Sequence, residues 1–241
     1  MPRLELIEDL TTGPVPLGSQ LIVEYDSTSM WFNASLNIVA EWLRTGGRAE
    51  YITHAQAPED LRSRLKRIEP RIDDYEVKDA AARNWDSKFV IWDGYSLTLG
   101  QKSKEKYAEE SLKVSDLSLT FSQEIMRGTP PIGTLVISDD LSVLSRFNDE
   151  KNWVEFELTR QFPAGKLQIV THLYGLLKGV QSEWAYKRLE AASDGVIEFK
   201  VDDSSDPPRS LIRIRSMRSV GFDGRWHQLN LNENLEVSLA K

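Results

Sequence analysis

The sequence of residues 18–35 reads GSQLIVEYDSTSMWFNAS. Its apolar run, residues 21–23, is typical of a buried strand, and the apolar stripe over residues 29–44 is typical of a helix. A strand that turns directly into a helix is the repeating unit of an α/β fold. The turn between these two elements is unusual because it carries large apolar side chains: Tyr25, Met30, Trp31 and Phe32.

The same alternation continues along the chain. Further strands are predicted at residues 48–53, 89–92, 134–138 and 167–171, and helices at 58–68 and 183–192. A polar stretch at 100–110 is expected to be mobile, and a helix is predicted to end near Met126 or Arg127. Strands at 196–201, 211–217, 226–231 and 235–239 follow, joined by short turns. We therefore predict one α/β domain over residues 1–241, with a mainly parallel sheet flanked by helices and extended by C-terminal antiparallel strands.

Composition narrows the classes of function. The 241 residues carry a net charge of −7, which disfavours non-specific binding to nucleic acid. Basic residues gather only at 62–67 and 209–219, and both patches are interpreted mainly as solvated faces. The chain has no cysteine and three scattered histidines, so no metal site is expected. No apolar run reaches the roughly 18 residues that span a membrane, and no signal-peptide pattern is present, so we expect a cytoplasmic protein.

Several segments, in this order, resemble the KaiC-like branch of the RecA superfamily, which has a three-layer P-loop ATPase fold. The glycine–serine turn and apolar strand at 18–24 resemble the family's opening. "YITHAQAPEDLRSRLKRI" resembles its second strand and proline-led helix, and "LVISDDLSVLSRF" its Walker B strand. "ASDGVIEFK" and "RIRSMRSV" resemble its Ala–Asp–Gly–Val–Ile turn and its Lys–Met–Arg–Gly segment. The resemblance covers nearly the whole chain and implies a RecA-like fold.

The phosphate-binding loop does not follow the family's pattern. A Walker A loop, G-x-x-x-x-G-K-[ST], uses glycines to bring backbone N–H groups to phosphate, a lysine for charge and a hydroxyl for Mg²⁺. The resemblance places Tyr25 and Met30 at the glycines, with Asp26 after the first of them. It places Trp31 at the lysine and Phe32 at the hydroxyl residue. This loop is therefore predicted to be degenerate.

The other catalytic positions depart from the family as well. The glutamate pair that contains the family's general base aligns with Ala55 and Gln56, which cannot take a proton from water. The lysine that the resemblance assigns to the neighbouring subunit's site is Ser216, although Arg218 remains as a possible contact between subunits. Asp139 keeps the Walker B position but makes only a weak magnesium site alone. We expect neither ATP nor Mg²⁺ as a cofactor, no metal and no catalytic residue.

Simple structural roles compete with functional ones at three places. Asp140 is expected to cap the next helix, with a metal at Asp139 and Asp140 as the alternative. Thr171 and His172 are expected to close a strand, His172 as a structural histidine rather than a phosphate sensor. Trp31 is expected to be buried in the core or to fill the vacant site, with an exposed contact face as the alternative.

These observations favour a pseudo-ATPase that acts through protein–protein contacts as a regulatory or assembly partner. The partner expected is an active KaiC-like or RecA-like paralogue, or a second copy of the chain, with no membrane involved. Two alternatives stay open. One is a nucleotide sensor without hydrolysis, and the other is a nucleic-acid-binding module that resembles the recombinase paralogues, using residues 209–219 and the 100–110 loop.

Overall fold

The computed structural model describes residues 2–79, 83–116 and 130–240. Within these ranges ten strands form one sheet in the order β10-β9-β8-β7-β1-β6-β5-β2-β3-β4. Neighbouring strands from β7 to β4 in this order are parallel, and β8, β9 and β10 extend the sheet in antiparallel fashion. The strands are β1 (Gln20–Tyr25), β2 (Arg48–Thr53), β3 (Phe89–Asp93), β4 (Tyr107–Ala108), β5 (Thr134–Ser138), β6 (Thr171–Leu177), β7 (Gly195–Asp202), β8 (Arg209–Met217), β9 (His227–Leu231) and β10 (Val237–Leu239).

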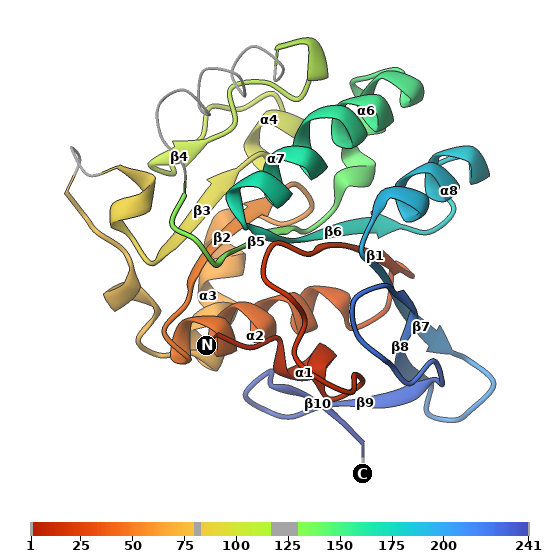
Figure 1. The fold of residues 1–241 in the computed structure, drawn as a ribbon. Coiled ribbons are helices and arrows are strands. Elements are labelled where there is room, and N and C mark those ends of the chain that lie inside the picture. Colours follow the sequence, from red (N-terminus) through yellow and green to blue (C-terminus); the bar gives the residue numbers. More distant parts are fainter. Residues whose placement is uncertain (1, 80–82, 117–129, 241) are drawn as a thin grey trace.

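Helices cover both faces of the sheet. Helices α1, α2 and α3 lie on one face, and α4, α6, α7 and α8 lie on the other (Figure 1). This makes the three layers that the sequence predicts. The helices are α1 (Glu5–Glu8), α2 (Trp31–Arg44), α3 (Pro58–Ile68), α4 (Tyr95–Thr98), α6 (Glu150–Phe156), α7 (Phe162–Gln168) and α8 (Glu183–Ala192). Short 3-10 helices are η1 (Ile72–Tyr75), η2 (Asn84–Asp86) and η3 (Leu141–Arg146), and a π-helical turn, η4 (Glu157–Gln161), joins α6 to α7.

A separate hydrophobic core lies on each side of the sheet, and β1 contributes to both. Leu21 and Val23 belong to the core beneath α1–α3, whereas Ile22 belongs to the core beneath α6–α8. Successive side chains of a strand point to opposite faces, so a strand covered on both sides is apolar throughout its middle. This explains the unbroken run at 21–23 that the sequence shows.

Most predicted elements are confirmed, but the strand predicted at 167–171 is wrong. Residues 162–168 form α7, and the Leu167 side chain is 84% exposed. Ile169 then takes a left-handed backbone conformation (φ 56°), and the strand begins only at Thr171. Thr171 and His172 therefore open β6 rather than close it, which moves them to the opposite edge of the sheet.

Two other expectations concern helices: one predicted near residue 126, and the absence of a helix that spans a membrane. The helix predicted to end near Met126 or Arg127 lies largely outside the described residues. None of the helices in the described ranges is long and apolar enough to cross a membrane.

Candidate functional site

The carboxyl ends of the parallel strands are where α/β sheets bind ligands, at the point where successive connections leave on opposite faces. Here that point lies between β1, which continues into α2, and β6, which continues into α8 (Figure 1). The loop at residues 26–30 joins β1 to α2. This is the position at which the resemblance places the phosphate-binding loop. The side chains of this loop therefore decide what the edge can hold.

Trp31, the first residue of α2, lies wholly inside the protein. Its side chain is 0% exposed, and its indole N–H donates a hydrogen bond to the backbone carbonyl of Asp139 at 2.8 Å. Its ring centroid lies 6.2 Å from that of Tyr25 and 5.5 Å from that of Phe199. The expectation of a buried Trp31 is confirmed, and its indole links the start of α2 to the residue that follows β5.

Four other side chains in or beside this loop also pack against or bind the protein: Tyr25, Asp26, Met30 and Phe32. Tyr25 is buried, and its ring centroid lies 5.4 Å from that of Phe32. Met30 and Phe32 are partly buried against the core under α2. The Asp26 carboxylate accepts a hydrogen bond from the Val201 amide at 3.2 Å. The loop thus brings apolar surface and a carboxylate to the place where phosphate would need N–H groups and a cation.

The Asp139 carboxylate is satisfied by the protein itself. It accepts hydrogen bonds from the backbone N–H groups of His54 (2.7 Å) and Ala55 (3.3 Å) and from the Thr53 hydroxyl (3.0 Å). Burial raises the pKa of this carboxyl to about 6, although His54 opposes the shift. Asp140 caps η3 by accepting from the Ser142 N–H at 2.9 Å, as the sequence predicts. No group of three His, Cys, Asp or Glu side chains in the described ranges is placed to hold a metal.

His54 forms a buried ion pair that the sequence did not reveal. Its Nε2 lies 2.8 Å from the Glu109 carboxylate. Burial alone would lower the pKa of His54, but Glu109 raises it to about 9. Gly94 lies against both side chains, and a Cβ there would come within 2.5 Å of each. Burial also raises the pKa of nearby Glu157 to about 8, so that carboxyl is protonated at neutral pH.

The 100–110 stretch, which was expected to be mobile, is attached to the sheet in this structure. It contains β4, which pairs with β3. The Ser103 hydroxyl donates to Asp93 at 2.5 Å, and Glu105 binds Arg62 at 2.7 Å. The Glu109–His54 contact and a hydrogen bond of 2.6 Å from Lys106 to the Asp79 carbonyl also hold this segment.

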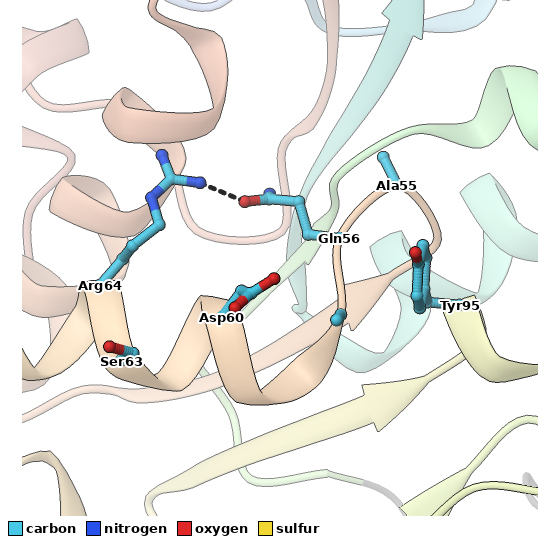
Figure 2. A pocket seen from close by; sticks show the side chains of 7 residues that line it. Ala55, Gln56, Asp60, Ser63, Arg64 and Tyr95 are labelled. Atoms are coloured by element: carbon cyan, nitrogen blue, oxygen red, sulfur yellow. Dashed lines mark hydrogen bonds between the residues drawn. The ribbon is translucent and has the colours of Figure 1, made fainter.

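Ala55 and Gln56 lie beside an open hollow of about 410 Å³ between α3 and α4 (Figure 2). The Gln56 side-chain oxygen accepts a hydrogen bond from Arg64, drawn as the dashed line in Figure 2. The Gln56 backbone carbonyl accepts from the Thr53 hydroxyl at 2.6 Å. Neither residue presents a carboxylate here, so these positions offer no general base.

Ser216 and Arg218 lie at the other edge of the sheet. Met217 pairs with Gly195, the first residue of β7, so β8 ends beside the amino ends of the parallel strands. Both Ser216 and Arg218 are exposed, and the Arg218 guanidinium donates to the Ala191 carbonyl. Arg218 therefore cannot reach its own chain's Asp139 edge.

His172 is a structural histidine, as expected. Its Nε2 shares a hydrogen bond with the Ser138 hydroxyl at 2.8 Å, and its ring stacks on Tyr174 at 3.7 Å. Burial lowers its pKa to about 3, so the imidazole is neutral. Because it sits at the second position of β6, it lies away from the carboxyl edge where a phosphate sensor would be needed.

Four of the eight basic residues in the two basic patches pair with carboxylates of the same chain. On α3, Arg62 binds Glu76 and Glu105, and Lys66 binds Asp73 at 2.8 Å. On β8, Arg213 binds Glu198. The Arg215 guanidinium donates two hydrogen bonds of 3.0 Å to the Glu24 carboxylate. These patches therefore offer few free cations to a phosphate backbone.

The sequence and the fold differ in how they resemble known proteins. No family model and no curated protein matches the sequence. Solved structures do match: a KaiC-like protein from Pyrococcus horikoshii has a TM-score of 0.66 at 11% identity, with 100% of this chain and 99% of that one covered. The flagellar accessory protein FlaH from Methanocaldococcus jannaschii has a TM-score of 0.72 at 10% identity, with 97% and 94% covered.

The chain has a KaiC/RecA-like fold. This confirms the fold class and the structural side of the resemblance. At these identities the likeness concerns the fold alone. Inferences about activity are therefore based on the residues at the carboxyl edge of this chain and not on the two similar structures.

Sequence reasoning missed two features of the site. It did not find the His54–Glu109 pair, because nothing local links residues 55 positions apart. It also overlooked Gly175, where a Cβ would lie 2.1 Å from the Asp139 carbonyl oxygen. A glycine inside the otherwise apolar "THLYGLL" is a signal of close backbone approach and could have indicated it.

Proposed function

We propose that this chain is a non-catalytic KaiC/RecA-like protein that acts as a regulatory or assembly partner through protein contacts. The observation that carries the proposal is the position of Trp31. Its buried indole occupies the start of α2, where helix N–H groups and a lysine would meet phosphate, and it is hydrogen-bonded to Asp139 at 2.8 Å.

The charges at this edge support the same conclusion. A bound triphosphate needs cationic partners, yet the loop offers the Asp26 carboxylate. Lys178, which lies 3.7 Å from Asp26, is also 3.5 Å from Glu198 and so already has two carboxylate partners. Hydrolysis also needs a base near the attacking water, and Ala55 and Gln56 supply none. The lack of a free cation disfavours nucleotide binding, and the lack of a base disfavours hydrolysis.

A partner role is supported by what the fold leaves available. Arg218 is exposed on the edge opposite Asp139, which supports a contact with another subunit rather than with its own site. The solved neighbour from Methanocaldococcus jannaschii is described as a flagellar accessory protein, and an accessory role of this general kind is what we propose here. The partner is an active paralogue or a second copy of the chain.

The two alternatives are less well supported. A nucleotide sensor would require Trp31 to leave a fully buried position. A nucleic-acid-binding module would need free basic residues, but Arg213 and Arg215 are bound to Glu198 and Glu24. The 100–110 segment, the other element of that alternative, is attached to the sheet by Asp93, Arg62 and His54.

Phosphate release from ATP tests the catalytic half of the proposal. The purified protein should show no turnover above a protein-free blank. A triple variant that restores the loop chemistry, Met30→Gly with Trp31→Lys and Phe32→Thr, should also show none, because Ala55 and Gln56 remain. Circular dichroism must first show that the variant is folded. Turnover by either protein would contradict the proposal.

A further inference from the structure

The hollow beside Gln56 carries polar groups that the rest of the chain leaves unused. It is open to solvent, measures about 410 Å³, and lies between the first turns of α3 and the start of α4 (Figure 2). Asp60 and Ser63, three residues apart on α3, point from the same helix face, and Tyr95 stands on the opposite side. None of these three side chains has a hydrogen-bond or ion-pair partner among the described residues.

The unpaired state of Asp60 is notable because a cation is close in sequence. Arg64 lies four residues further along α3, the spacing at which opposite charges normally pair on a helix. Its guanidinium instead donates to the amide oxygens of Gln56 and Asn33. Arg64 therefore lines the hollow without pairing with Asp60, whose carboxylate has no counter-ion among the described residues.

The other cations of α3 are also committed. Arg62 binds two glutamates, Glu76 and Glu105, and Lys66 binds Asp73. Arg67 donates to the Glu233 backbone carbonyl. No cation among the described residues therefore pairs with the exposed Asp60 carboxylate, which is open to a basic side chain of another molecule. A carboxylate, a hydroxyl and an aromatic ring around one hollow are the groups that receive a basic side chain, by a charge-assisted hydrogen bond and a cation–π contact.

We propose that this hollow is a docking site for a lysine or arginine side chain presented by a partner protein. The proposal rests on the proposed function, because it names the chemistry of one contact in a role that acts through protein partners. The open shape of the hollow suits a side chain on a protein surface, and the net charge of −7 favours a basic partner over an acidic one.

Amide chemical shifts in the full chain provide the test. Acetylated and amidated tripeptides Gly-Arg-Gly and Gly-Lys-Gly serve as probes, with Gly-Gln-Gly as the uncharged control. At least one basic peptide should give saturable shifts at residues 55–64 and 94–96 that weaken with added salt. Free methylamine should bind more weakly than the peptides if a protein side chain, rather than a small amine, is the occupant.

Matched variants make the test specific. Asp60→Asn should weaken peptide binding about tenfold, which is the effect of losing a hydrogen bond to a charged group. The separate variant Tyr95→Leu should also weaken peptide binding, because it removes the cation–π contact. Asp74→Asn removes an exposed carboxylate elsewhere and should change nothing. Absent shifts, an equal response to the glutamine peptide, methylamine binding as tight as the peptides', or unchanged binding by Asp60→Asn would overturn the proposal. Because ATP turnover is measured separately, a failure here is distinct from a failure of the proposed function.

Discussion

At the scale of single residues, our proposal of a closed nucleotide site depends most on Trp31. Its indole is buried against Tyr25 and Phe199 and hydrogen-bonded to Asp139, so this side chain is part of the packed core. In our proposal it also fills the nucleotide site. Removing it therefore costs packing energy.

We predict that Trp31→Ala lowers the free energy of unfolding by about 3–5 kcal/mol, as for other buried aromatic residues. Trp184→Ala is the matched control, because Trp184 is 41% exposed, and it should change stability by less than about 1 kcal/mol. Urea unfolding followed by far-UV circular dichroism measures both. Equal, small effects for the two variants would show that Trp31 does not act as a packed residue.

The His54–Glu109 pair makes a second prediction, about pH. The pKa of His54 rises from 6.5 to about 9 on folding, because Glu109 outweighs the effect of burial. Its stabilising contribution is therefore fully present below pH 6.5 and is lost as the pH rises through about 9. Burial also raises the pKa of Glu157, to about 8, and this acts in the same direction.

The melting temperature should accordingly fall between pH 6.5 and 9. Glu109→Gln should flatten this dependence, because His54 then loses the carboxylate that keeps it charged. Glu110→Gln, an exposed neighbour, should leave the dependence as it is in the unaltered protein. A steep pH dependence that persists unchanged in Glu109→Gln would exclude this pair as its source.

At the scale of elements, β6 shows both what the sequence predicts and where it fails. The bounds of β1, β2, α3 and β5 follow from apolar runs, periodicity and Pro58. The start of β6 does not, because Leu167, Ile169 and Val170 have the apolar character of a buried strand although Leu167 is exposed on α7. Only the packing of α7 against the sheet decides whether these residues form a helix or a strand. No local sequence pattern indicates that packing.

Gly175 on β6 yields a prediction of its own. A methyl group there would lie 2.1 Å from the Asp139 carbonyl oxygen and 2.9 Å from the Trp31 indole nitrogen. Gly175→Ala should therefore separate β6 from the Trp31–Asp139 contact and destabilise the protein by about 1–3 kcal/mol. Gly13→Ala, whose new methyl group would meet its nearest neighbour at 3.7 Å, should have little effect in the same denaturation experiment.

At the scale of the whole molecule, the two edges of the sheet have different characters. Trp31, Asp139 and the His54–Glu109 pair lie at the carboxyl edge, whereas the exposed Arg218 lies at the amino edge. The sequence predicted the layers and the burial of Trp31. It could not predict contacts such as His54–Glu109, which exist only once the sheet brings β2, β3 and β4 together. The molecule has the RecA-like frame, and in the function that we propose Trp31 fills the nucleotide site of that frame.

Calorimetric titration with ATP and with ADP, each with and without Mg²⁺, tests most directly whether this edge is closed. We expect no saturable heat up to millimolar nucleotide, because Trp31 occupies the start of α2 and Asp139 is bound by the chain itself. Saturable binding at micromolar nucleotide would contradict a filled site and would show that the protein binds nucleotide despite Trp31.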